Sequence, residues 1–295
     1  KKLLNLESKS MPSTKTKTVA ITGAGKGLGA AYALHLASKG MNVLVNNRKH
    51  PEQINTADQI VELIKQNGGT AFANYASIED PNSGNEILEQ CLDEFGSLDY
   101  LINNAGISEG RTFNKVSLDD FNKVLDINLT GTINITHPCF KHIYKQNSGG
   151  IIFTTSSAGL FGQHGMPAYS CAKAAIVGLA LSLHLESKNK NININVISPF
   201  ALTNMTKTLL TEDQSEKFTA DKIAPFIEFL LESPDVSGNI FIAGGGKFKV
   251  AKMYENDGIA LANISRDSLS KSFKSLVDST NLIYREDASE SFDAL

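Results

Sequence analysis

The stretch that decides the fold is TGAGKGLG, residues 22–29, which lies between a strand-like segment and a helix-like segment. Residues 18–22 are short and β-branched, while apolar residues recur at helical spacing over 28–39 and Gly40 is suited to end that helix. Glycines at a strand-to-helix turn let the backbone approach a pyrophosphate closely, and the first N–H groups of the helix attract that anion. The sequence therefore predicts a nucleotide-binding turn.

The glycine spacing in this turn is TGxxxGxG rather than GxGxxG, because leucine occupies position 28. An ordinary glycine-rich turn would account for the glycines alone, but the flanking strand and helix favour binding. The residues that we expect to contact a cofactor here are Thr22, Gly23, Lys26, Gly27, Leu28 and Gly29.

Strand-like and helix-like segments alternate on the C-terminal side of the turn as far as about residue 250. The expected strands are 18–22, 43–45, 98–102, 151–155, 192–197 and 239–242, and the expected helices are 28–39, 57–66, 87–95, 121–144, 169–187 and 223–232. This alternation is typical of an α/β protein with a Rossmann-like, doubly wound parallel sheet. We expect a linker at 1–17, a single domain at 18–250 and a C-terminal extension at 251–295. The start at Lys1 rather than Met suggests a piece of a longer chain.

Composition excludes several classes of partner. The 295 residues are 41% hydrophobic and 20% charged, and the net charge of −3 argues against nucleic acid or an anionic membrane as a partner. No segment suggests a membrane span of roughly 20 apolar residues, and the polar residues 1–17 do not resemble a signal peptide. Three widely spaced cysteines without a CxxC pair, and scattered histidines, predict no metal site and no disulfide framework.

A second group of residues suggests acid–base chemistry. Tyr169 and Lys173 stand four positions apart on an expected helix, so their side chains share one face. A tyrosine has a reference pKa of about 10, and a neighbouring ammonium favours the phenolate, so that proton abstraction near neutrality becomes possible. The lysine can also donate to a ribose hydroxyl. Because YxxxK occurs by chance on many helices, the pair needs support from its surroundings.

Ser156 supplies part of that support. It follows the expected strand 151–155 and precedes Tyr169 by thirteen positions, where its hydroxyl can orient a substrate oxygen against the tyrosine. The neighbouring Ser157 is the alternative for this role.

Two asparagine motifs complete the pattern. Asn128 falls inside an expected helix, where an asparagine is often a kink or a surface residue, but where it can also hold a water that relays protons from Lys173 to solvent. The stretch NNAG, residues 103–106, follows a strand and lies where ligands bind in open α/β sheets, although the same residues also make a good turn. The expected cofactor contacts from this stretch are Asn104, Ala105 and Gly106.

In this order and spacing, TGxxxGxG, NNAG, Asn128, Ser156 and YxxxK resemble the short-chain dehydrogenase/reductase family over about residues 18–246. The resemblance implies a Rossmann-like domain, a nicotinamide cofactor, and catalytic roles for Asn128, Ser156, Tyr169 and Lys173. It also implies cofactor contacts by Pro199, which Phe200 follows where many members have glycine, and by Thr203, which stands where the family's threonine meets the nicotinamide carboxamide.

A narrower resemblance joins stretches such as SAGLFGQHGMPAYSCAKAAIVGLA and NVISPFALTNMTKTLL to the dehydrogenase units of peroxisomal multifunctional enzymes of type 2. The sequence is most similar to the second such unit of the fungal form. This implies oxidation of (3R)-hydroxyacyl-CoA in peroxisomal fatty-acid β-oxidation, and a homodimer or a pairing with a sister unit. The peroxisomal location comes from the resemblance alone, because residues 293–295 are not an SKL-type signal.

The departures from the family pattern lie on the nucleotide side. Asn47 stands where the multifunctional group has an aspartate that bonds the adenosine ribose and repels a 2′-phosphate, and Ser77 replaces an aspartate that holds the adenine amino group. Arg48 and Lys26 are placed to pair with a 2′-phosphate. The resemblance therefore favours NAD, whereas the local chemistry favours NADP. The alternatives are an NADP-dependent reductase of another ketone or secondary alcohol, and a non-catalytic dimerising unit.

Overall fold

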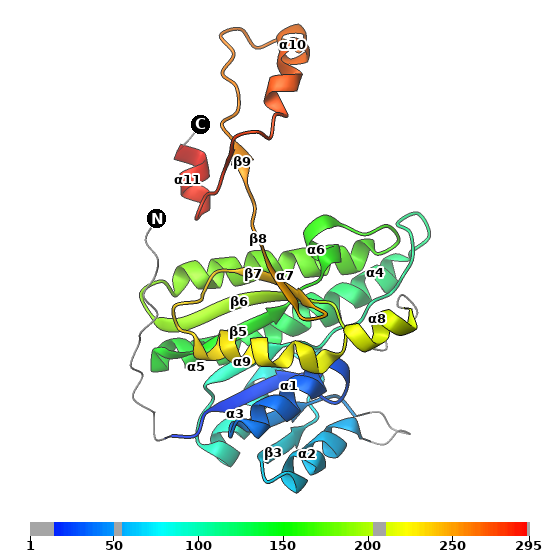
Figure 1. Cartoon of the computed structure of the whole chain (residues 1–295), viewed down its shortest axis with the longest axis vertical. Helices are drawn as coiled ribbons and strands as arrows, with labels where there is room; N and C mark the ends of the chain where they lie inside the picture. The colour runs from blue at the N-terminus through cyan, green and yellow to red at the C-terminus, as the bar shows by residue number, and fades with distance from the viewer. Residues whose placement is uncertain (1–14, 50–54, 203–210, 294–295) are drawn as a thin grey trace. The chain divides into compact units, whose positions relative to one another are not determined.

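The computed structural model describes residues 15–49, 55–202 and 211–293. They fall into two compact units, which divide between Phe248 and Lys249. The first unit contains a large sheet flanked by helices (Figure 1), and the second is a small unit of short elements.

The sheet of the first unit has the strand order β3-β2-β1-β4-β5-β6-β7-β8, and every pairing from β3 to β7 is parallel. The strands are β1 Thr18–Thr22, β2 Asn42–Asn46, β3 Thr70–Asn74, β4 Tyr100–Asn103, β5 Ser148–Thr154, β6 Asn191–Pro199, β7 Ile240–Gly244 and β8 Lys247–Ala251. An order of 3-2-1-4-5-6 is that of the Rossmann-like doubly wound fold, so the predicted fold class is confirmed. Its switch point lies between β1 and β4.

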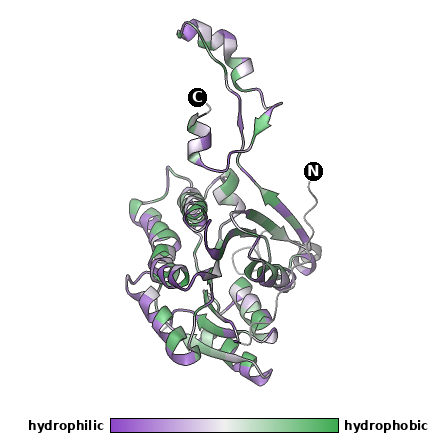
Figure 2. Ribbon diagram, turned by 90° about the vertical axis from the view of Figure 1, so that its left-hand side faces the viewer, coloured by the Kyte–Doolittle hydropathy of each residue, from purple (hydrophilic) through white to green (hydrophobic). Residues whose placement is uncertain are grey.

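Helices cover both faces of this sheet. They are α1 Gly27–Ser38, α2 Thr56–Gln66, α3 Ser83–Phe95, α4 Leu118–Leu125, α5 Gly131–Gln146, α6 Ser157–Phe161, α7 Pro167–Glu186, α8 Glu212–Lys217 and α9 Ala224–Glu232, with short turns η1 Asp126–Thr130 and η2 Ala220–Lys222. Helix α1 packs against α2 and α9, whereas α3 packs against α5 and α7 against α4. Figure 2 shows hydrophobic residues gathered along the strands between these helices, as expected for strands buried on both faces.

Several elements differ from the sequence expectation, and β8 and α8 are two that were not expected at all. Strand β3 was not expected, because its sequence TAFAN lacks a run of β-branched residues, yet all five residues pair in register with β2. The expected helix 121–144 is interrupted by the π-helical turn η1. The short helix α6 follows Ser156 directly and was not among the expected helices.

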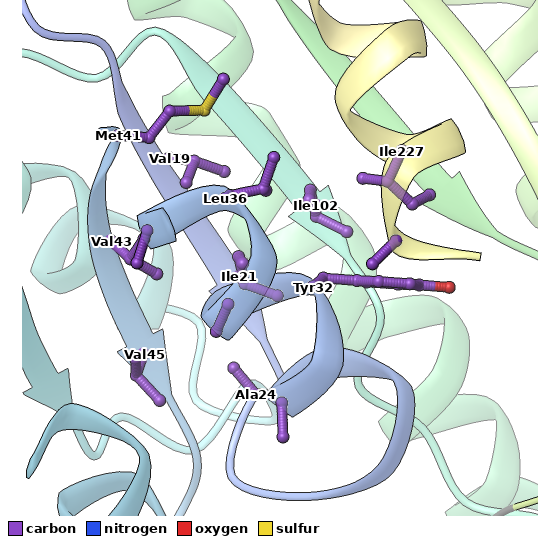
Figure 3. Close-up of a cluster of buried hydrophobic side chains, with 14 of the residues drawn as sticks. Val19, Ile21, Ala24, Tyr32, Leu36, Met41, Val43, Val45, Ile102 and Ile227 are labelled. Atoms are coloured by element: carbon purple, nitrogen blue, oxygen red, sulfur yellow. The ribbon is translucent and has the colours of Figure 1, made fainter. Parts of the chain in front are cut away.

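The core between α1, α9 and the sheet explains why the first βαβ unit forms. Val19, Ile21 and Val45 from β1 and β2 are fully buried, and Tyr32 and Leu36 of α1 pack over them. Figure 3 shows Tyr32 extending from α1 towards Ile227 of α9. Full burial of a large apolar side chain stabilises a fold by about 1.5–3 kcal/mol, so this cluster holds the glycine turn against the sheet.

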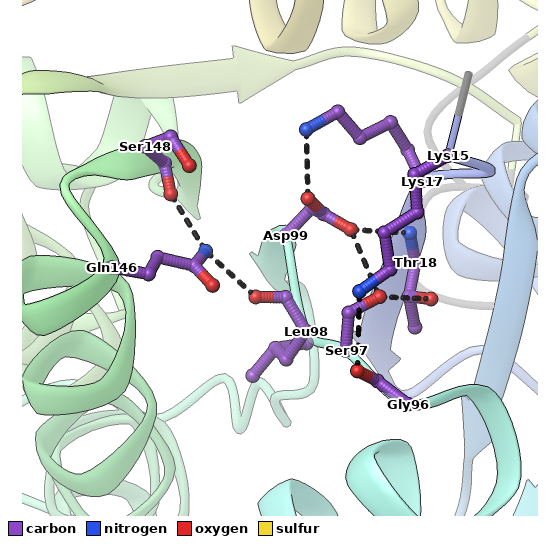
Figure 4. A network of polar contacts seen from close by, with 9 residues as sticks. All are labelled: Lys15, Lys17, Thr18, Gly96, Ser97, Leu98, Asp99, Gln146 and Ser148. Carbon is purple, nitrogen blue, oxygen red and sulfur yellow. Dashed lines mark hydrogen bonds and ion pairs between the residues drawn. The ribbon is translucent and has the colours of Figure 1, made fainter. Parts of the chain in front are cut away.

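A polar network ties the amino ends of β1 and β4 together (Figure 4). The Asp99 carboxylate accepts hydrogen bonds from the Thr18 backbone N–H at 2.9 Å and from the Ser97 hydroxyl at 3.2 Å, and it pairs with the Lys17 ammonium at 2.8 Å. The network lies at the sheet edge opposite to the carboxyl ends of the strands. It therefore fixes the register of these strands without taking part in a site at the carboxyl ends.

Helix α7 is long and apolar enough to cross a membrane by length and composition, which we did not expect from the sequence. A core helix of a globular protein meets the same criteria. Here α7 packs against β5, β6, α4 and α6, and its buried face includes the charged Lys173. We therefore describe α7 as a helix of the sheet's outer layer.

The second unit consists of short elements. Strand β9, Glu255–Asn256, pairs antiparallel with β10, Leu282–Ile283, and helix α10, Arg266–Leu276, begins at a capping box formed by Ser265 and Ser268. Helix α11 spans Ala288–Asp293. The Arg285 guanidinium donates to the Glu255 carboxylate at 2.6 Å, and the Ser291 hydroxyl donates to the other oxygen of that carboxylate.

Candidate active site

The glycine turn follows β1 and leaves no room for side chains. Gly23 and Gly27 have φ values of +64° and +58°, in the left-handed region that favours glycine. A Cβ atom at Gly23 would lie 2.8 Å from the Ala105 Cα, and one at Gly29 would lie 2.5 Å from the Gly23 carbonyl oxygen. Lys26 is the N-cap of α1 and its side chain makes no capping hydrogen bond. The turn thus presents the N-terminal end of α1 to an anion.

Thr22 joins the glycine turn to the NNAG stretch. Its hydroxyl oxygen accepts hydrogen bonds from the backbone N–H groups of Asn104 and Ala105, both at 3.0 Å. The Asn104 side-chain amide donates in return to the Thr22 carbonyl at 3.0 Å. The structure therefore brings these two predicted segments together, and Thr22 acts by holding them side by side.

Asn128 lies in the π-helical turn and is completely buried. Its amide donates to the carbonyls of Ile107 at 2.9 Å and Val124 at 2.8 Å, and its oxygen accepts from the Ile107 N–H at 3.2 Å. A Cβ at Gly106 would lie 2.4 Å from this oxygen. The surface-residue alternative is therefore wrong, whereas a local break in the helix is observed. Both amide hydrogens are used, so this side chain holds the loop after β4 in place.

Tyr169 and Lys173 lie on the inner face of α7. Burial raises the pKa of Tyr169 above its ordinary value, and a hydrogen bond with Ser156 offsets part of this rise. Lys173 is 3% exposed, and its ammonium donates to the Thr154 carbonyl at 2.8 Å. The same ammonium lies 5.7 Å from the centre of the Tyr169 ring. Burial lowers the pKa of Lys173 to about 8. We expected the lysine to lower the tyrosine's pKa, but the pKa of Tyr169 lies above its ordinary value, and Ser156 is the neighbour that offsets part of this rise.

The structure also separates the two candidate serines. Ser156 is the N-cap of α6, where its hydroxyl accepts from the Ala158 N–H at 3.3 Å, and it is the serine that reaches Tyr169. The Ser157 hydroxyl lies 3.4 Å from that of Ser198 on β6. Only Ser156 among the two therefore faces the tyrosine.

Three residues that support this group were missed by the sequence reasoning. The Thr154 carbonyl holds the lysine, and the Thr155 hydroxyl donates to the Lys173 carbonyl at 2.7 Å. At Gly159 a Cβ would lie 2.7 Å from the Lys173 backbone, so this glycine allows α6 to touch α7. A carbonyl contact leaves no signal in a sequence, but a glycine three positions after a candidate serine does.

The residues expected around the adenosine ribose lie at the carboxyl ends of β2 and β3. The Asn47 amide donates to the Thr56 hydroxyl at 2.9 Å, and its backbone N–H donates to the Asn74 carbonyl at 3.0 Å. A Cβ at Gly25 would lie 2.2 Å from the Thr56 hydroxyl and 2.9 Å from the Asn47 Cγ. The glycine turn therefore rests directly on Asn47.

Arg48 and Ser77 meet at a carboxylate that we did not single out in the sequence. The Arg48 guanidinium lies 3.3 Å from the Glu79 Oε2, and the Ser77 hydroxyl donates to the same oxygen at 3.2 Å. Pro199 ends β6, and the ring of the following Phe200 packs edge-on against Phe218. Thr203 lies outside the described residues.

The charged groups of this region do not form a metal site. Within residues 15–49, 55–202 and 211–293, no group of three or more His, Cys, Asp or Glu side chains is arranged to hold a metal ion.

Comparison with known proteins identifies the family. The family model for short chain dehydrogenases matches residues 17–215. The peroxisomal hydratase-dehydrogenase-epimerase of Saccharomyces cerevisiae is 39% identical over 83% of this chain and 28% of its own length. The 3-oxoacyl-[acyl-carrier-protein] reductase of a Synechocystis species is 33% identical over 80% of this chain and 98% of its own length.

A solved structure matches almost the whole chain. The full-length peroxisomal multifunctional enzyme type 2 of Drosophila melanogaster superposes with a TM-score of 0.80 at 28% identity, covering 95% of this chain and 48% of its own. The chain thus spans about half of this relative and just over a quarter of the yeast one. The chain belongs to the short-chain dehydrogenase/reductase family, whose members are oxidoreductases that use NAD or NADP.

Proposed function

We propose that this chain oxidises a (3R)-hydroxyacyl-CoA to the 3-ketoacyl-CoA, as a dehydrogenase unit of peroxisomal fatty-acid β-oxidation. The observation that carries the proposal is the contact of Tyr169 with Ser156 beside the buried Lys173, whose ammonium lies 3.5 Å from the place that a Cβ at Gly106 would take, in a chain related to peroxisomal multifunctional enzymes. The expected domain limits, the linker at 1–17, the peroxisomal location and the homodimer remain parts of this proposal.

The residues present fit a nicotinamide dinucleotide. The glycine turn offers backbone without a Cβ atom at Gly23, Gly25 and Gly29, and the buried Lys173 has further N–H donors beyond the one bonded to Thr154. The glycine turn, Asn104 to Gly106 and Lys173 would hold the cofactor. When bound, the cofactor would supply the acceptor for the hydride that leaves the carbinol carbon of the substrate.

The chain's own residues supply the acid–base chemistry. Tyr169 accepts the proton of the substrate hydroxyl at its phenolic oxygen, and Ser156 bonds the substrate oxygen beside it. Lys173 binds the nicotinamide ribose. The water relay at Asn128 remains part of this proposal. Both of its amide hydrogens are bonded and its oxygen accepts from Ile107, so the same side chain also positions the loop at Ile107.

The test is Tyr169→Phe in the full chain. We expect turnover of (3R)-hydroxyacyl-CoA to fall by at least about a hundredfold, because the proton acceptor is lost, while NADH still binds. The matched control is Tyr144→Phe on the outer side of α5, which should retain wild-type rates. Undiminished turnover in Tyr169→Phe would overturn the catalytic assignment.

A second candidate is favoured by the relative named as an acyl-carrier-protein reductase. The chain would then reduce a 3-ketoacyl group or another ketone with NADPH. Initial rates with (3R)-hydroxyacyl-CoA and NAD, compared with 3-ketoacyl thioesters and NADPH, separate these functions. A chain that binds neither NADH nor NADPH would instead be a non-catalytic dimerising unit.

A further inference from the structure

Glu79 supplies a carboxylate at the place where the sequence lacks one. Positions 47 and 77 carry Asn and Ser, yet Glu79, in the loop after β3, contacts Arg48, which follows position 47, and Ser77 itself. Its Oε2 lies 3.3 Å from the Arg48 Nη1 and 3.2 Å from the Ser77 Oγ. One carboxylate oxygen therefore engages two of the side chains, Arg48 and Ser77, that we expected to meet the adenosine half of a cofactor.

The cations after β2 consequently have partners within the chain. Arg48 pairs with Glu79, and the Lys49 ammonium lies over the Tyr75 ring, 4.1 Å from its centre. The Tyr75 hydroxyl in turn donates to the Asp58 carboxylate. Lys26, at the N-cap of α1, forms no hydrogen bond or ion pair of its side chain within the described residues, so it is the expected 2′-phosphate partner that Glu79 does not engage.

We propose that Glu79 determines the choice between the two nicotinamide cofactors and makes the site select NAD(H). It engages the guanidinium that a 2′-phosphate needs as its partner, and it adds a negative charge that repels such a phosphate. It thus performs from the β3–α3 loop the role of an aspartate at position 47. This inference rests on the proposed function, since it requires that the site bind a nicotinamide dinucleotide.

The role of the Arg48–Glu79 pair can be tested by mutation, because the pair contributes little to the stability of the fold. The Arg48 and Glu79 side chains are 48% and 38% exposed, and an ion pair of this kind contributes little to stability. Replacement of either residue therefore leaves a folded protein in which cofactor choice can be measured. Glu62, an exposed carboxylate on α2 that accepts from Gln66, is a matched control outside the site.

The experiment titrates the full chain with NADH and with NADPH and follows the fluorescence of each reduced cofactor. We expect the wild type to bind NADH more tightly. In Glu79→Gln the Kd for NADPH should fall about tenfold while that for NADH changes little. Adding Arg48→Gln to Glu79→Gln should remove most of this gain, and Glu62→Gln should match the wild type.

Two results overturn the inference: a wild type that binds NADPH at least as tightly as NADH, and an unchanged ratio of the two Kd values in Glu79→Gln. Both leave the proposed function standing, because a nicotinamide cofactor still binds. If neither cofactor binds to the wild type or to any variant, the proposed function itself fails, and the inference fails with it.

Discussion

At the scale of a residue, the burial of the charged Lys173 side chain lowers the stability of the folded chain. Burial lowers its pKa from 10.5 to about 8, so the folded chain loses this proton before the unfolded chain does. Between about pH 8 and 10.5 the unfolded state binds more protons, so the contribution of Lys173 to stability rises with pH in this window. Below pH 8 both states are protonated and the burial cost is fully present.

This predicts a pH-dependent difference between the wild type and Lys173→Met. From pH 7.5 to 9.5 the wild type should gain about 2 kcal/mol of unfolding free energy relative to the variant. Urea unfolding at the two pH values measures both free energies, and the subtraction removes the titration of other groups. An equal change in both proteins would contradict the lowered pKa of the lysine.

The sequence predicted the identity of the site residues better than the role of each residue. Tyr169, Ser156 and Lys173 could be found because spacing along a helix and along the chain records which residues can meet. The saturated amide of Asn128 and the shared contacts of Glu79 could not be found, because they depend on loops folding back from β4 and β3. A sequence pattern shows the periodicity of helices and strands, whereas the contacts of Asn128 and Glu79 join loop residues that follow no periodic spacing.

At the scale of an element, α4, η1 and α5 show the same limit. Periodicity predicted one continuous helix, but the Asn128 amide takes the Val124 carbonyl, and a π-helical turn forms there. Such turns occur often at functional sites. Strand β3 was not predicted because its pairing with β2, and not its own composition, makes it a strand.

Helix α7 carries the prediction that belongs to this scale. Its hydropathy matches that of a membrane span, yet only 33% of its most apolar window is buried within the chain. Ala174, with a small side chain, and Gly178, with none, are exposed on the outer face, which allows close approach by a second copy. We expect Gly178→Arg to convert the proposed homodimer to a monomer, as light scattering would show. Ser182→Thr, a small change on the same face, should keep the dimer, and a wild-type monomer would contradict the proposal.

At the scale of the whole molecule, the sequence predicted the fold of the first unit but not the structure of the second. The alternation of strands and helices over the first unit follows from burial of each strand on both faces, which the sequence displays. The second unit has two-residue strands and one capped helix, and its main polar contact joins Glu255 to residues 30 and 36 positions away. No local pattern predicts such an arrangement, and the sequence indicated only an extension.

In the parallel sheet, the proposed site lies at the carboxyl ends of the strands, whereas a stabilising polar network lies at their amino ends. Polar residues at the carboxyl edge form the site, whereas Asp99 at the amino edge accepts from Thr18 and Ser97 and pairs with Lys17. Asp99→Ala leaves the buried Thr18 N–H without its acceptor, so we expect the free energy of unfolding to fall by about 2 kcal/mol. Urea unfolding measures this loss, with the exposed Asp235→Ala as control. Because the two edges are distinct, the NADH Kd of folded Asp99→Ala should equal that of the wild type, and a weakened Kd would show that the edges are coupled.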